Sequence, residues 1–85
     1  MLSAHEAITK HVSAQNRHLV HFAELDELRE QAIERCSSLC KAGETFSVNE
    51  INEITAQINA HARKGISPTR VFVTEEMVRE YAAKI

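Results

Sequence analysis

The feature that most constrains this chain is an unbroken stretch from Ser3 to Gly43 with no proline or glycine between its ends. Proline and glycine interrupt helices most strongly, so their absence favours one long helix. Apolar or small residues recur at steps of three or four positions, with Gln15 keeping the phase: Ile8, Val12, Leu19, Phe22, Leu25, Leu28, Ala32, Cys36 and Leu39. This coiled-coil-like period predicts an amphipathic helix over residues 4–42.

Both ends of this predicted helix carry recognisable signals. Ser3 and Glu6 have the S-x-x-E spacing of a capping box, in which each side chain satisfies a free backbone amide. Gly43 is expected to adopt the left-handed conformation that ends many helices. A helix of about 39 residues would be roughly 58 Å long, nearly twice the ~30 Å diameter of a compact chain of this size.

A second helix is expected over residues 48–64. Ser47 and Glu50 form a second S-x-x-E pair, and Phe46 and Ile51 are spaced for a hydrophobic staple. Gly65 supplies the end of this helix. The connection to the first helix is short, which predicts an antiparallel helical hairpin.

The remainder of the chain is expected to be an extended linker followed by a short helix over residues 75–84. Pro68 restricts the residue before it to extended conformations, and we expect residues 66–73 to be held to the core by their apolar side chains. Thr74 is the expected N-cap of the last helix. Its predicted buried face consists of Met77, Val78, Tyr81, Ala82 and Ile85. The predicted fold is all-α, in a single domain of residues 1–85.

The length of the first helix has a consequence for association. The helix must kink, be lined by both later helices, or pair with another chain, and no proline or glycine supplies a kink. The simplest way to bury the exposed apolar stripe of this helix is contact with a second copy of the chain across a two-fold axis. We therefore expect a homodimer, with these interface residues: Val12, Leu19, Phe22, Leu25 and Leu28.

Histidines are concentrated in the first quarter of the chain. His11, His18 and His21 lie along one side of the first helix, and Glu24 extends the row. Imidazoles and carboxylates so placed could bind Zn²⁺ or another transition metal. The stronger interpretation is that they flank the apolar stripe as ordinary polar neighbours, because H-x-x-H spacing alone is a weak signal. Protonation of the same histidines could also make association depend on pH.

The two cysteines, Cys36 and Cys40, are four positions apart on one predicted helix, a placement unsuited to a disulfide between them. We interpret both as reduced thiols, one or both of them in the apolar stripe. A nucleophilic cysteine would need an adjacent base, and His61 is the sole histidine downstream. Without a phosphate-binding loop or a supported Cys–His pair, we expect no enzyme activity and no cofactor.

The amino-acid composition excludes some classes of function. Net charge is −2, with 44% hydrophobic and 26% charged residues. Signs are interspersed, which argues against nucleic-acid binding, and no apolar run approaches the ~20 residues of a membrane span. We expect a cytoplasmic protein. One face of the second helix is rich in amides and could meet a partner helix, although a solvated polar face is the simpler interpretation: Asn49, Asn52, Gln57 and Asn59, with Thr55.

Three blocks of sequence carry a resemblance to a known family. They are AITKH at 7–11, FSVNEIN at 46–52 with TAQIN at 55–59, and GISPTR at 65–70 with VTEEMV at 73–78. Together they resemble the YpbS-like proteins, short uncharacterised proteins of endospore-forming bacteria. The resemblance spans nearly the whole chain, implies a bacterial cytosolic origin, and transfers no site residues.

The sequence therefore leaves two hypotheses for function. The first is a small non-enzymatic helical module that binds another protein and forms a homodimer. The alternative is a small metal- or ligand-binding protein that uses the histidine row.

Overall fold

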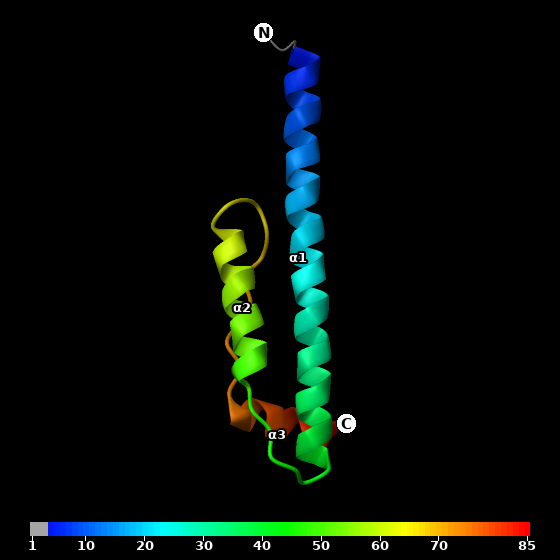
Figure 1. Cartoon of the computed structure of the whole chain (residues 1–85), viewed down its shortest axis with the longest axis vertical. Coiled ribbons are helices and arrows are strands. Elements are labelled where there is room, and N and C mark those ends of the chain that lie inside the picture. Colours follow the sequence, from blue (N-terminus) through cyan, green and yellow to red (C-terminus); the bar gives the residue numbers. More distant parts are fainter. Residues whose placement is uncertain (1–3) are drawn as a thin grey trace.

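The computed structural model describes the backbone of residues 4–85 and the side chains of residues 14–85. It contains three helices, α1 (Ala4–Lys41), α2 (Asn49–Ala62) and α3 (Glu75–Lys84), and no strand within the described residues. The predicted all-α fold and its helix order are confirmed. The molecule is a rod of 62 × 18 × 17 Å, in which α2 runs antiparallel beside α1 and α3 crosses the lower end (Figure 1).

Helix α1 runs without a sharp bend and ends as predicted (Figure 1). Gly43 has a φ of +75°. The Gly43 amide donates to the Cys40 carbonyl at 3.1 Å and the Glu44 amide donates to the Leu39 carbonyl at 2.9 Å, which is the Schellman pattern. The predicted Ser3–Glu6 capping box lies outside the residues whose side chains are described.

The core lies at the lower end of the rod, where all three helices contribute. Its buried residues are Ala32, Cys36, Ile51, Val73 and Val78. Partly buried apolar side chains pack around them, namely Ile33, Cys40, Phe46, Val48 and Ile54. Leu25, Ile58 and Ala82 are buried as well, and burial of all these side chains supplies the apolar driving force for so short a chain.

The predicted Ser47–Glu50 capping box is wrong. Helix α2 has Val48 as its N-cap, with no side-chain cap bond, and the Ser47 hydroxyl accepts from the Asn49 amide at 3.2 Å in the turn just before the helix. Glu50 does not return the bond, because its carboxylate accepts from Arg35 on α1 at 2.6 Å. Glu50 therefore joins α2 to α1 through an ion pair and does not cap its own helix.

The extended segment after α2 is held differently from the prediction. Only Val73 among its apolar residues is buried, whereas Val71 and Phe72 are exposed. Two asparagines of α2 hold the backbone instead. Asn52 donates to the Val73 carbonyl at 2.9 Å and accepts from the Val73 amide at 2.7 Å, and Asn59 makes the same pair of bonds with Arg70 at 3.0 and 2.8 Å.

The spacing of these two clamps has a geometric reason. Asn52 and Asn59 are seven positions apart on α2, which is about 10.5 Å of helix. Arg70 and Val73 are three positions apart, and an extended backbone covers about 9 Å over that interval. The two distances are similar, so the segment can lie antiparallel along α2. Each asparagine side chain then both donates to and accepts from the backbone of the residue opposite.

Arginines tie the same segment to α1. Arg29 donates to the Thr55 hydroxyl and to the Val71 carbonyl, both at 2.9 Å. Arg70 bonds Asp26 at 3.0 Å and lies over the Phe22 ring at 5.1 Å. Half-buried, charge-assisted contacts of this kind fix a segment that has little apolar burial of its own.

Helix α3 begins at the predicted cap, since the Thr74 hydroxyl accepts from the Met77 amide at 3.2 Å. Its predicted buried face is only partly correct. Val78 and Ala82 are buried, while Met77, Tyr81 and Ile85 are exposed, because α3 is too short and too oblique to present more than one narrow side to α1. No helix in the described part of the chain is both long and apolar enough to span a membrane.

Candidate functional site

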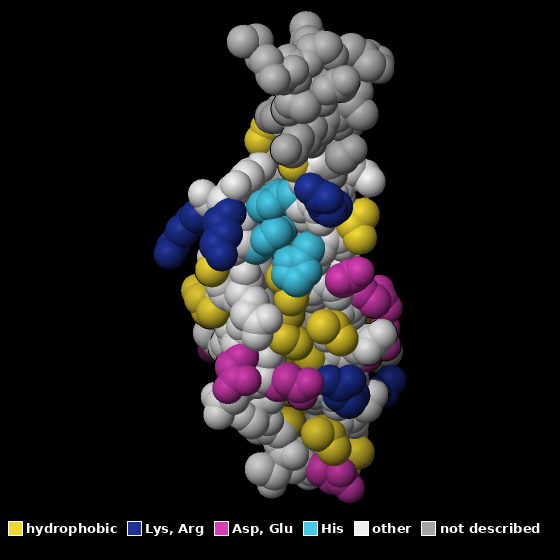
Figure 2. Space-filling view, turned by 45° about the horizontal axis from the view of Figure 1, so that its top comes forward, with side chains coloured by type: hydrophobic (Ala, Val, Ile, Leu, Met, Phe, Trp, Pro, Cys, Tyr) yellow, Lys and Arg dark blue, Asp and Glu magenta, His cyan; other side chains and the backbone are white. Residues whose placement is uncertain are grey.

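The upper end of α2 meets α1 through a cluster of histidines, which we call the histidine cluster: His18 and His21 of α1 with His61 of α2. The rings of His18 and His61 are stacked, with centroids 3.6 Å apart and planes inclined by 16°. His21 meets His61 edge-on, at 4.7 Å and 71°. The three imidazoles form one continuous patch on the molecular surface (Figure 2).

Hydrogen bonds fix two of these rings. His61 Nε2 lies 2.8 Å from the backbone carbonyl of His18, and since a carbonyl only accepts, His61 Nε2 carries the proton. His18 Nε2 lies 3.0 Å from the Ser67 hydroxyl. The cluster therefore joins α1, the end of α2 and the turn after it.

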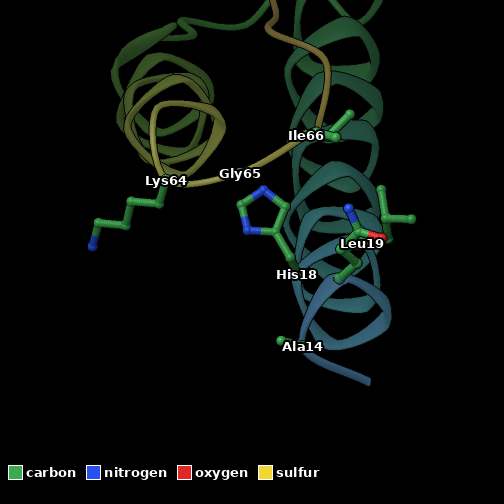
Figure 3. Close-up of a pocket in the computed structure, with 7 residues that line it drawn as sticks. Ala14, His18, Leu19, Lys64, Gly65 and Ile66 are labelled. Atoms are coloured by element: carbon green, nitrogen blue, oxygen red, sulfur yellow. The ribbon is translucent and has the colours of Figure 1, made fainter. Parts of the chain in front are cut away.

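Gly65 has a role that differs from the prediction. Among the described residues other than glycine none has a positive φ, and of the glycines only Gly43 does, so Gly65 does not end α2 by a left-handed turn. A Cβ at Gly65 would instead lie 2.9 Å from atoms of the His18 ring. The ring fits against the bare backbone of the turn (Figure 3), so any side chain at this position would have to displace His18.

The electrostatic surroundings of the cluster disfavour a charge on His18. Burial lowers its pKa below the ordinary value, and the neighbouring His61 and His21 lower it further. Glu24 offers a carboxylate to His21, at 3.9 Å between Nδ1 and Oε2, and both side chains are largely exposed. Basic side chains flank the imidazoles on both sides in Figure 2.

A pocket of about 520 Å³ opens beside the cluster. It is lined by Ala14, Gln15, His18, Leu19, Lys64, Gly65 and Ile66. The His18 ring lies between α1 and the turn, while the Lys64 side chain extends away from it (Figure 3). The wall is therefore mainly apolar, with one imidazole as its central polar group.

The predicted metal ligands are brought together only in part. His18, His21 and Glu24 lie in or beside the cluster, while the His11 side chain lies outside the described residues. His61 belongs to the cluster although the sequence offered no reason to join it to the others. Across residues 14–85, no group of three or more histidine, cysteine or acidic side chains is arranged to hold a metal ion.

The predicted interface residues have different surroundings. Leu19 and Leu28 are exposed, Phe22 is half-buried beneath Arg70, and Leu25 is buried inside the chain. The Val12 side chain is not among those described. Leu19 and Leu28 are thus the members of the set that the chain leaves open to contact.

The two thiols lie far from the histidine cluster. Both are free, and Cys36 is buried with its Sγ 3.5 Å from the Ser47 carbonyl. Burial raises the Cys36 pKa, and Cys40 and Glu75 raise it further. His61 lies beside His18, which is about 27 Å along α1 from Cys36. The Cys–His arrangement considered from the sequence is therefore not formed.

These observations define an elongated helical hairpin with a short crossing helix and a histidine cluster at the upper joint. The family model described as "Protein of unknown function (DUF2533)" matches residues 2–84. The chain is also 45% identical over 85 residues to the "Uncharacterized protein YpbS" of Bacillus subtilis (strain 168), with all of both chains covered. The chain therefore belongs to this YpbS-like family, as the sequence blocks indicated. No solved structure matches it.

Proposed function

We propose that this protein is a non-enzymatic interaction module of the cytoplasm that pairs with a second copy of itself through the upper part of α1. The observation that carries this proposal is the projection of α1 beyond α2 (Figure 1). Helix α2 ends at Ala62, level with His18. Residues 4–17 of α1 therefore have neither of the other two described helices beside them.

The length of this projection favours a second copy as the partner. Fourteen helical residues span about 21 Å. Two such projections placed antiparallel around a two-fold axis cover each other over the same length, and each would end near the upper end of the other copy's α2. Two-fold pairing of this kind is the commonest form of homo-oligomer.

Exposed apolar residues at the base of the projection support the same arrangement. Leu19 is 48% exposed and Ile66 is 77% exposed, and both line the pocket beside the histidine cluster. Covering them with the end of a partner's α1 would bury apolar surface that the single chain leaves in water.

The test is sedimentation equilibrium of the untagged protein and two matched variants. We expect a dimer for the wild type and a shift toward monomer for Leu19→Glu, because a carboxylate would be buried in the interface. Val20→Glu is the control, since Val20 is 49% exposed and differs from Leu19 by one helical position, which turns it about 100° away. A monomeric wild type, or equal effects of the two substitutions, would contradict the proposal.

The metal-binding alternative is tested on the same samples. Elemental analysis of protein purified without a histidine tag should find no stoichiometric transition metal. A constant stoichiometric metal would favour the alternative over the interaction module.

A further inference from the structure

The two ends of α2 are attached to α1 by different kinds of contact. Its lower and middle parts bury Ile51, Thr55 and Ile58. Beyond Ile58 no residue of α2 is buried. The direct contacts of this end with α1 are the His61 stack and the His61–His18 hydrogen bond, and the His18–Ser67 bond holds the turn that follows. Asn59 is joined to α1 only through Arg70, which bonds Asp26. The upper joint is therefore made largely of groups that can be protonated near neutral pH.

We propose that His18, His21 and His61 form an acid-sensitive latch, which holds the end of α2 and residues 63–67 against α1 and releases them on protonation. The latch acts within one chain. It does not depend on the proposed self-association.

The geometry accommodates one proton in the cluster. A protonated His61 keeps its bond from Nε2 to the His18 carbonyl, because that nitrogen is already a donor. Its charge then lies over a neutral His18 ring. The third ring, His21, has the Glu24 carboxylate 3.9 Å from its Nδ1.

A proton on His18 in addition to His61 is different. Two cationic rings would then be stacked with centroids 3.6 Å apart, and like charges at such a distance repel strongly even when water screens them in part. Separating the rings requires the turn that carries Gly65 and Ser67 to move away, since both contact His18.

The charged groups around the latch do not compensate these protons. Glu24 is the carboxylate placed against the cluster, beside His21. The basic residues nearest in the sequence are Arg17, next to His18 on α1, and Arg63 and Lys64 after the end of α2, all three of them exposed. The next carboxylate along α1, Asp26, is already bonded to Arg70 at 3.0 Å. In Figure 2 basic side chains lie on both sides of the imidazoles, and acidic side chains lie lower on the same face.

The direction of the His18 pKa shift agrees with this arrangement. The pKa of His18 is lowered in the folded chain, so the unfolded or released chain binds more protons. Stability of the closed joint is therefore complete above the ordinary histidine pKa of about 6.5 and is lost as pH falls below it.

The test is amide hydrogen exchange at about pH 7.5 and about pH 5.5, a range in which carboxylates stay ionised. Rates are corrected for intrinsic exchange, and both samples are kept at a concentration where sedimentation gives the same mass. We expect protection of the amides of residues 59–64 to fall at least about fivefold at the lower pH. The amides of residues 51–56 should change less than about twofold, because the core below holds them.

Two variants identify the origin of the effect. His18→Phe keeps a flat ring but cannot be protonated, so its protection at residues 59–64 should become nearly independent of pH. Ser67→Ala is the matched control, because it removes a hydrogen bond to the same ring while leaving the pH dependence. If His18→Phe does not fold, His61→Phe removes the other stacked imidazole and carries the same expectation.

Three results would overturn the latch. One is a wild-type protein whose residues 59–64 keep the same protection at both pH values. Another is a phenylalanine variant that retains the full pH dependence. The third is an equal loss of protection in residues 51–56, since that would indicate loosening of the whole molecule.

Discussion

The lower and upper ends of the α1–α2 pair offer a direct comparison within one short molecule. At the lower end, α1 and α2 meet over buried aliphatic groups, with Ile51 only 1% exposed. At the upper end they meet over imidazole rings, of which His18 and His61 are half-buried and His21 is exposed. The same two helices are joined by hydrophobic burial at one end and by polar, titratable contacts at the other.

This difference predicts an uneven distribution of stability along the rod. Apolar burial is insensitive to pH and responds to the volume of the side chains. Imidazole contacts are worth less and change with proton concentration. Local opening should therefore begin at the upper joint, while the lower core determines the global free energy of unfolding.

The largest expected effect comes from a cavity in the lower core. Ile51→Ala should reduce the free energy of unfolding by about 2–5 kcal/mol, because Ile51 is fully surrounded and the space cannot collapse completely. Chemical denaturation measures the change. Val20→Ala, at the level of the upper joint but outside the proposed interface, is the control and should stay within about 0.5 kcal/mol because Val20 is 49% exposed. Similar losses for both would remove the distinction between the two ends.

The next largest effect concerns the asparagine clamps, which connect the two ends along α2. Asn52→Ala should cost about 1–3 kcal/mol, because it leaves the Val73 amide and carbonyl without their partner. Gln57→Ala is the matched control, since Gln57 is an exposed amide on the same helix. A loss for Asn52→Ala no greater than for Gln57→Ala in chemical denaturation would mean that Val73 alone anchors the segment.

The helices of this fold follow from local signals, whereas the contacts between them do not. The absence of breakers, the three- and four-residue steps and Gly43 define α1, and Thr74 defines the start of α3. Each of these signals depends on neighbouring residues only. The partners of Asn52 and Asn59 are found across the chain, and an amide-rich helix face looks the same whether it meets solvent or backbone.

The histidine cluster shows why the candidate site was only half predictable. Joining His61 to His18 requires the register of the hairpin, and the register is not set by the length of the turn alone. Glu50 pairs with Arg35 rather than with the last turn of α1, so α2 starts about one and a half helical turns above the end of α1. The space below is occupied by α3, which packs against α1 (Figure 1). The residue of α1 that lies opposite His61 therefore goes together with the packing of α3, which the sequence around His61 does not reveal.

The smallest expected effect tests whether the lower end is as purely apolar as the comparison assumes. Ser37 is 1% exposed, and its hydroxyl has no hydrogen-bond partner among the described residues. A buried hydroxyl without a partner costs free energy, and alanine also has the higher helix propensity. Ser37→Ala should therefore leave the protein equally stable or stabilise it by up to about 1 kcal/mol, as measured by chemical denaturation.

Ser38→Ala, at the exposed neighbouring position, isolates the gain that comes from helix propensity alone. If Ser37→Ala were destabilising while Ser38→Ala was not, the hydroxyl would have to bond a backbone carbonyl of the preceding turn. The lower end would then share with the upper one a dependence on polar contacts.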